Sequence, residues 1–524
     1  MQSFEFGFGT SRGKKREEEI MHVGVLADLS GQPAEPLPLV PHRKFLEIDV
    51  DNFDDRLGTL GPRLAFAVPN SVVGKGELNV EVKFRSLEDF EPQAVCSQVP
   101  VLRKLLAARR RLAAMRATPK GRELQGRPQL EALLAQAVED PELRVAILPS
   151  LGAAPPAPEA PAAPTPEPAP QEKPQASALS DLEKLLGLKP GDRPAPKPKG
   201  VVQGIVEQAL ADTPRISAEA VQNLGALIGR MDELLAQQLT LTLRHRAFKT
   251  LEGTWRGLHY LVSNVEMDED LKLRVFDMSK EDLAATALAY QGENWELHPL
   301  RTQMRHEPFG CLIGDYYFDH SPANVAVLAG VARLVQELDL PFIAAVTPKL
   351  LGLEDWRQLR VTADTGCALQ DEAHAAWRLI GQSAAAKQLF LTMPRFLARL
   401  PYGKKTNPAE GIEYEEKHDI TSSADFVWCN AAYGLGVVLA RAFKADGWAA
   451  SLRSGGEDCM VEGLPALHYT DQYGDTELMC PTEVSLTVEA AATLNHLGLT
   501  PLLHMKNTDR AIFAAAPALH RPAK

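Results

Sequence analysis

The sequence predicts a mixed α/β (α+β) protein made of two parts that fold together. Its 524 residues are enough for roughly three domains of ordinary size. Apolar runs of strand length alternate with amphipathic helical patterns, which favours sheets flanked by helices. Residues 151–200 separate two such patterned regions and are rich in proline and alanine. Because proline lacks a backbone N–H and disfavours helix in the preceding residue, we expect a disordered linker there.

Composition divides the chain into segments around that linker. The residues before the linker are called the N-terminal part below, and those after it the C-terminal part. We expect an N-terminal arm (1–20), a first domain (21–148), the flexible linker (149–200), helices that open the C-terminal part (201–250), a second domain (251–516) and a short tail (517–524).

The N-terminal part reads mainly as short strands. Phe4, Phe6 and Phe8 alternate with polar or small residues, the period of a strand, and a lone strand needs another segment or chain to pair with. The alternative is a frayed terminus. Strands are then expected within 21–31, 43–70 and 78–92, with a short helix inside the second range. A helix is expected to start at Val99 and to end before Pro119, and a second helix is expected at 130–138. Residues 177–191 predict one or two amphipathic helical turns of marginal stability.

The C-terminal part opens with an amphipathic helix from about Ser217, a plausible N-cap. Its apolar stripe is explained either by an ordinary core helix or by a helix that pairs with the helix starting at Val99. One helix could do both, so the two interpretations are compatible. The pairing residues would be Leu102, Leu105 and Leu112 with Leu227, Met231 and Leu234. Buried strands are predicted at 271–279, 309–318 and 341–348, and helices at about 280–290, 322–338 and 426–444.

Charge and cysteine content narrow the class of protein. A net charge of −12 argues against a nucleic-acid binder, which needs a basic face. The basic cluster on the helix after Val99 is better explained as a solvated or subunit-facing stripe. Six scattered cysteines suit buried thiols in a reducing compartment. No secretory signal opens the chain, and uncharged stretches such as Phe426 to Ala440 are too short to cross a bilayer, so we expect a cytoplasmic protein without membrane insertion.

The sequence contains no strong catalytic motif. Glycine-rich phosphate loops and the H-E-x-x-H zinc motif are missing from it, as are a nucleophile elbow and any Cys/His cluster at metal-ligand spacing. Cys459 and Cys480 stand beside turn residues and are the least implausible nucleophiles. Buried, inert thiols are the favoured interpretation of both. We therefore expect no enzyme, no cofactor and no metal.

The N-terminal part resembles the small subunit (TssB) of the bacterial type VI secretion contractile sheath. The resemblance covers residues 20–138. It is carried by the motifs VLADLSG (25–31), RKFLEID (43–49), DNFD (51–54), VPN (68–70), FRSLEDFEP (84–92) and QVPVLRKLL (98–106).

The C-terminal part, over residues 201–515, is similar to the large subunit (TssC) of the same sheath. Its motifs are LEGTWRGL (251–258), PFGCLIGDY (308–316), PFIAA (341–345), PRFLARLPYG (394–403), TNP (406–408), VEGLP (461–465), CPTEV (480–484) and KNTD (506–509). The resemblance implies structural roles for Trp255, Arg256, Arg395, Arg399, Tyr402, Asn407, Glu462, Glu483, Lys506 and Asn507.

The resemblance implies a sheath protomer with both subunits co-folded. Such protomers stack around an inner tube, exchange terminal strands with neighbours, and contract to propel tube and spike out of the cell. Implied partners are other sheath protomers, the inner tube protein, the baseplate and an ATP-driven unfoldase that recycles contracted sheath. By position, Val202, Ile205, Val206 and Leu210 would form the unfoldase-binding helix, and Phe4, Phe6 and Phe8 the exchanged strand. A simple packing helix is the alternative at 202–210.

Two departures from the family pattern open a second hypothesis. The subunits are normally separate chains, and the match to the large subunit stops near Ala516, before the C-terminal region of family members. Either a separate chain supplies that region, or this protein is a sheath-like regulatory or capping adaptor that does not itself polymerise.

Overall fold

The structure is a computed structural model that describes residues 6–7, 20–117, 147, 220–359, 369–452, 457–470 and 473–521. These residues fall into two compact units, one of residues 1–106 with 234–524 and one of residues 107–233. The predicted helices at 130–138 and 177–191 lie outside the described residues, as do Phe4, Phe8, Val202, Ile205, Val206 and Leu210.

In the N-terminal part, strands and helices alternate at short intervals. They are β1 (Phe6–Gly7), β2 (Met21–Ala27), β3 (Leu46–Ile48), α1 (Phe53–Leu60), β4 (Arg63–Pro69), β5 (Glu77–Lys83), α2 (Pro92–Gln98) and α3 (Pro100–Ala117). The C-terminal part opens with α9 (Ala220–Leu243) and α10 (Arg246–Ser263).

The C-terminal part continues with alternating strands and helices. They are β6 (Leu271–Asp277), α11 (Lys280–Ala289), α12 (Pro299–Met304), β7 (Phe309–Phe318), α13 (Pro322–Leu338), β8 (Phe342–Val346), α14 (Ala375–Gln382), β9 (Leu389–Met393), β10 (Phe396–Leu397), β11 (Trp428–Cys429), α15 (Ala431–Asp446), β12 (Ser451–Leu452), β13 (Met460–Val461), β14 (His468–Thr470), β15 (Thr476–Leu478), α16 (Val488–His496), β16 (Leu499–His504) and β17 (Ala511–Phe513). Short 3₁₀ turns join several of them.

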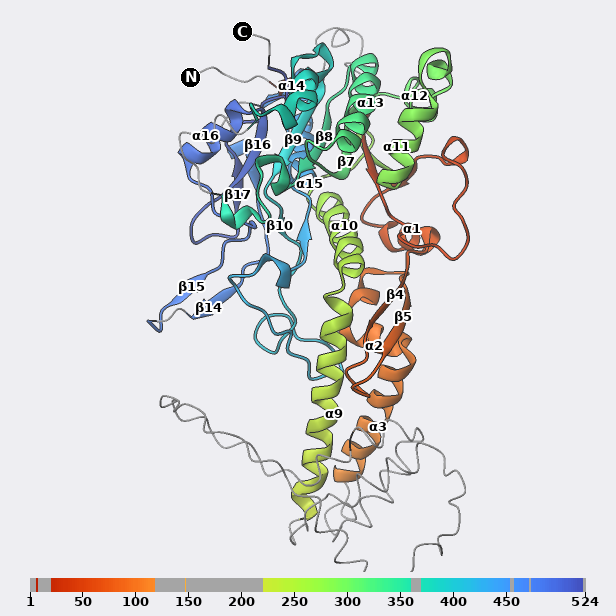
Figure 1. The fold of residues 1–524 in the computed structure, drawn as a ribbon, viewed down its shortest axis with the longest axis vertical. Coiled ribbons are helices and arrows are strands. Elements are labelled where there is room, and N and C mark those ends of the chain that lie inside the picture. The colour runs from red at the N-terminus through yellow and green to blue at the C-terminus, as the bar shows by residue number, and fades with distance from the viewer. Residues whose placement is uncertain are drawn as a thin grey trace, which may run out of the picture. The chain divides into compact units, whose positions relative to one another are not determined.

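A single sheet takes strands from both parts of the chain. Its order is β13-β17-β16-β9-β8-β7-β2-β6-β3, and Figure 1 shows β7, β8, β9 and β16 within it. Strand β2, from the N-terminal part, lies parallel between β6 and β7 of the C-terminal part and pairs with β6 along all seven of its residues. Strand β3 closes one edge antiparallel to β6. The predicted α/β fold with co-folded parts is confirmed.

Helices cover both faces of this sheet, because side chains of successive strand residues point to opposite faces. Leu312, Phe342 and Ala344 belong to the buried cluster that also contains apolar residues of α13. On the other face, α15 packs on β7, β8 and β9 and on α10. The near-continuous apolar runs that predicted buried strands therefore reflect burial on two faces.

One predicted helix boundary is wrong. The helix expected from residue 426 begins at Ala431, after Asn430 caps it by accepting a hydrogen bond from the Ala432 amide. Residues Trp428–Cys429 form β11 instead, antiparallel to β10. The uncharged run was continuous in the sequence, so hydropathy alone did not show where strand gives way to helix.

The N-terminal strand and a hairpin lie outside the large sheet. Strand β1 pairs antiparallel with β12, with Phe6 opposite Leu452. Strands β4 and β5 form a two-stranded antiparallel pair, and β5 alternates exposed and buried residues as its sequence predicts.

Within the unit of residues 107–233, an ion pair connects α3 to α9. Arg109 Nε donates to Asp232 Oδ1 at 2.9 Å, and Leu112, Leu227 and Met231 are all buried. The other residues of the predicted pairing, Leu102, Leu105 and Leu234, belong to the larger unit and are buried there. The pairing of the two helices along their full length stays a prediction.

A search of the described helices finds none with the length and apolarity that a bilayer crossing requires.

Cleavage of the linker should leave the two parts associated, because β2 is hydrogen-bonded on both sides by strands of the C-terminal part. A specific protease site placed between residues 151 and 200 should yield two fragments that co-elute on gel filtration. A Val25→Pro chain, which loses a backbone donor in this central strand, should release its fragments. Separation of the fragments of the otherwise unchanged chain would contradict the shared sheet.

Candidate functional site at the interface of the two parts

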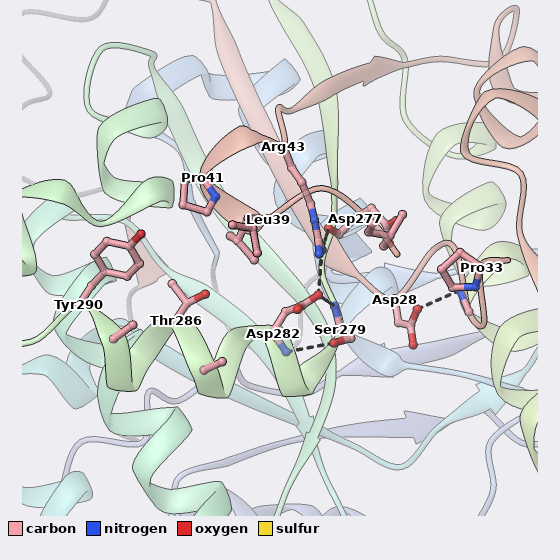
Figure 2. A pocket seen from close by; sticks show the side chains of 15 residues that line it. Asp28, Pro33, Leu39, Pro41, Arg43, Asp277, Ser279, Asp282, Thr286 and Tyr290 are labelled. Carbon is pink, nitrogen blue, oxygen red and sulfur yellow. Dashed lines mark hydrogen bonds and ion pairs between the residues drawn. The ribbon is translucent and has the colours of Figure 1, made fainter. Parts of the chain in front are cut away.

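An aspartate at the end of β6 is held by residues of the N-terminal part. Asp277 Oδ1 accepts the backbone N–H groups of Leu29 at 2.8 Å and Ser30 at 3.3 Å, and Oδ2 accepts the Ser30 hydroxyl. The Arg43 guanidinium donates to the Asp277 carbonyl at 2.9 Å and to the Asp282 carboxylate at 2.8 Å (Figure 2). A carboxylate of one part thus satisfies polar groups that the other part buries.

A cavity of about 540 Å³ lies beside these contacts and is lined by both parts. Figure 2 shows Leu39 of the N-terminal part near Thr286 of α11, whereas Arg43 points toward Asp282 and Asp28 lies beside Pro33. Leu39 remains 73% exposed. The cavity is therefore a surface hollow that exists only when the two parts are folded together.

Helix α10 is the element around which both parts assemble. It carries the sequence LEGTWRGL (251–258), and its N-cap is His245. On one side, the Trp255 indole donates to the Leu29 carbonyl at 3.0 Å and its ring stands edge-on to Phe53 at 5.7 Å. Phe248 packs edge-on against Phe84 and Phe90 of the N-terminal part. Aromatic pairs of this geometry stabilise beyond their burial alone.

The glycines of α10 allow other segments of the C-terminal part to approach this helix closely on its other sides. A Cβ at Gly253 would stand 2.4 Å from the Trp428 carbonyl oxygen, and one at Gly257 would stand 2.5 Å from the Tyr433 ring. Neither distance leaves room for a methyl group. Glycine is required at both positions because backbone and ring contact the helix directly.

A buried ion network joins α10 to the segment after β10. Arg399 Nε donates to Glu252 Oε1 at 2.7 Å and its Nη1 donates to Glu416 Oε2 at 2.8 Å, while Arg256 also donates to Glu252 at 2.8 Å. Glu252 is fully buried and Arg399 is 7% exposed. Burial raises the pKa of the Glu252 carboxyl, but the charges of Arg399 and Arg256 outweigh it, so the net pKa is lowered. Tyr402 completes the network, with its ring 4.1 Å from the Arg399 guanidinium.

A second buried carboxylate lies within strand β7. Asp315 accepts hydrogen bonds from the hydroxyl of Thr254 on α10 at 2.6 Å, from Asn430 at 3.0 Å and from the Tyr433 hydroxyl at 3.2 Å. Burial raises its pKa in spite of these three donors. The carboxylate fixes α10, β7 and the start of α15 relative to one another.

The remaining motif residues organise loops. Arg395 forms a bidentate pair with Glu483 at 2.8 and 2.6 Å. The Asn407 carbonyl accepts the Gly403 N–H at 2.8 Å, and the Glu462 carbonyl accepts the Tyr260 hydroxyl at 2.7 Å. Lys506 and Asn507 are exposed in the turn between β16 and β17, where Asn507 has a left-handed φ of 59°.

Several residues of this interface were missing from the sequence-based site. Glu252, Arg43 and Asp315 stood inside the quoted motifs without an assigned role, and Asp277 and Glu416 were not considered. A signal existed for two of them, because Asp277 and Asp315 interrupt apolar strands and a buried carboxylate needs partners. Nothing in the sequence marked Glu416, since its partner Arg399 is brought to it by a loop.

The surroundings of the two candidate nucleophiles, Cys459 and Cys480, do not favour a reactive thiolate. Cys459 is buried, and Cys480 is half-buried with its sulfur 3.1 Å from the Thr482 hydroxyl. Burial raises the pKa of Cys480, whereas a nucleophilic thiol needs a lowered pKa. The described residues hold no cluster of His, Cys, Asp and Glu suited to a metal ion.

Substitution of Gly253 by alanine should lower the free energy of unfolding by about 1–3 kcal/mol, because backbone must move to admit the methyl group. Gly229→Ala is the matched control: this helical glycine is exposed and has no atom within 4 Å of a Cβ, so alanine should be neutral or stabilising. Urea unfolding measures both. Equal effects would show that the close approach to Trp428 is unimportant.

Removal of the Arg399 charge should lower the free energy of unfolding far more than removal of a surface charge does. Arg399→Met leaves Glu252 and Glu416 buried without their shared partner, and should destabilise by about 3–5 kcal/mol. Arg230→Met breaks the exposed pair with Glu233 and should cost below about 1 kcal/mol. If Arg399→Met lowers the free energy of unfolding by no more than Arg230→Met does, the buried ion network does not stabilise the fold.

Comparisons with known proteins agree with this two-part construction. Residues 6–152 match the family described as "Type VI secretion system, VipA, VC_A0107 or Hcp2". Residues 225–520 match the family described as "EvpB/VC_A0108, tail sheath N-terminal domain".

Two relatives from Pseudomonas aeruginosa (strain PAO1) match separate regions of the chain. The type VI secretion system sheath protein TssC1 is 40% identical over 334 residues, which are 62% of this chain and 66% of the relative. The sheath protein TssB1 is 46% identical over 125 residues, which are 24% of this chain and 70% of the relative. The chain thus spans slightly less than two thirds of the TssC1 relative. It belongs to the type VI secretion sheath family and is a fusion in which a TssB/VipA region precedes a TssC/VipB region.

Proposed function

We propose that this chain is a structural component of a type VI contractile sheath that assembles around the inner tube and contracts to propel tube and spike. Family membership supports association with other sheath subunits. The observation that carries the proposal is the position of β2 between β6 and β7. One chain thereby supplies both regions of a single sheet in a fixed ratio of one to one.

Contraction in this proposal is driven by changes in contacts between protomers and involves no bond chemistry, so the protein is not an enzyme. Buried networks such as that of Arg399 keep each protomer rigid, and rigid bodies transmit small shifts at their interfaces. The proposed partners are the inner tube protein, the baseplate and an ATP-driven unfoldase. Val202, Ile205, Val206 and Leu210 remain the proposed unfoldase-binding residues.

Strand exchange is the proposed means of joining neighbours. Strand β1 pairs with β12 in the same chain, and thirteen residues, 8–20, separate it from β2. An extended segment can add to a free sheet edge through main-chain hydrogen bonds. We propose that Phe4, Phe6 and Phe8 form the same pairing with β12 of a neighbouring copy.

Electron microscopy of the purified chain, alone and with candidate sheath partner chains, should show helical tubes. Deletion of residues 1–8 should abolish the tubes and leave the melting temperature nearly unchanged, because the large sheet does not include β1. The Gly229→Ala chain should form tubes normally. Binding of the chain only at the ends of preformed tubes would favour a capping adaptor, and tubes from the shortened chain would rule out exchange of β1.

A further inference from the structure

A cavity of about 600 Å³ lies at the carboxyl ends of β7 and β8 and beside the first turns of α10. Its wall includes Tyr317 from β7, Thr347 just after β8, and Lys249 from α10. In open parallel sheets, the crevice outside the carboxyl ends of the strands is the usual place for a ligand. No residue of this cavity has a role in the sheath interactions proposed above.

The wall presents hydrogen-bond donors that lack acceptors. The buried Thr347 hydroxyl and the buried Nε–H of Arg244 have no partner among the described residues. Among the described residues, Lys249 Nζ donates only to the Ala424 carbonyl, a neutral acceptor. Arg246, also on the wall, is exposed. In the part of the chain that the structure describes, neither Lys249 nor Arg246 forms an ion pair.

The acids of the wall are already satisfied by other groups. Glu483 is paired with Arg395, and Asp315 accepts its three hydrogen bonds from neutral donors. Asp355 accepts from the Ser423 hydroxyl and from the Arg357 N–H. Glu354 is exposed. Arg244 is paired with Asp425 at 3.3 Å and Arg395 with Glu483, so among the described residues of the wall Lys249 and Arg246 are the cations that have no ion pair.

The pKa of Lys249 is shifted mainly by the burial of its amine. Burial, together with the charges of Arg395 and Arg244, lowers its pKa to about 8 against the weaker opposing effect of Asp425 and Glu416. An anion next to the amine would relieve this repulsion.

We propose that this cavity is an anion-binding site that takes a phosphate or carboxylate group, with Lys249, Arg246, the Arg244 Nε–H and the Thr347 hydroxyl as its donors. The anion comes either from free phosphate or from an acidic side chain of a neighbouring copy. The site itself does not depend on the proposed sheath function, because its donors all belong to one chain.

Acylation of Lys249 in the unassembled chain, quantified by mass spectrometry across pH, tests the site with inorganic phosphate as the probe. At constant ionic strength, phosphate should raise the apparent pKa of Lys249, slow its acylation several-fold and raise the melting temperature by mass action. Arg246→Gln should weaken the protection of Lys249, and Lys249→Met should remove the shift in melting temperature. Arg230→Gln is the control that should retain both effects.

The assembled form distinguishes the two sources of the anion. If a neighbouring copy supplies a carboxylate, Lys249 should be protected in tubes without added phosphate and should react in the unassembled chain. If only phosphate protects it in both forms, the ligand is a free anion. The proposal is overturned if Lys249 reacts equally with and without phosphate and equally in both forms, or if Arg246→Gln and Lys249→Met respond to phosphate as the parent chain does. A failure to form tubes affects only the comparison of sources.

Discussion

The structure depends on the backbone hydrogen bonding of strand β2. All seven of its residues are buried, and both of its edges are occupied by strands that lie far away in the sequence. A strand in this position has no route to satisfy its N–H and C=O groups except through β6 and β7. Without β2, those two strands would expose edges in the middle of the apolar core. Neither part of the chain therefore contains the whole of this nine-stranded sheet.

Helix α10 gives this shared sheet its specificity. Apolar surfaces would tolerate several arrangements, but a buried carboxylate tolerates only those that bring its partners. Glu252 requires Arg399 and Arg256, and Asp315 requires Thr254, Asn430 and Tyr433. Such networks are stable as complete sets, since the loss of one member leaves the others buried and unpaired. The motif LEGTWRGL is thus a set of contacts in which nearly every residue meets a different partner.

The fusion changes the thermodynamics of pairing more than its geometry. In separate chains, the N-terminal part must find its partner by diffusion, whereas the covalent connection between the two parts makes the encounter intramolecular, at an effective concentration of about millimolar. The same argument applies to β1, whose pairing with β12 in its own chain competes with pairing between copies.

The sequence by itself determined the fold class and the strands β2, β3, β6, β7 and β8 of the large sheet, because these depend on local periodicity, whereas β9, β13, β16 and β17 were not predicted. It also singled out Trp255, Arg395, Arg399 and Glu483, through a family resemblance. Only the tertiary structure decided that β2 lies between β6 and β7, since strands buried on two faces have no pattern that identifies their neighbours. It also decided that Glu416 and Glu252 share Arg399, because long-range ion pairs depend on where loops return and leave no periodic signal. The tertiary structure also decided where β11 ends and α15 begins within a single apolar run. Asn430 caps α15 at this point and is held there by its hydrogen bond to Asp315.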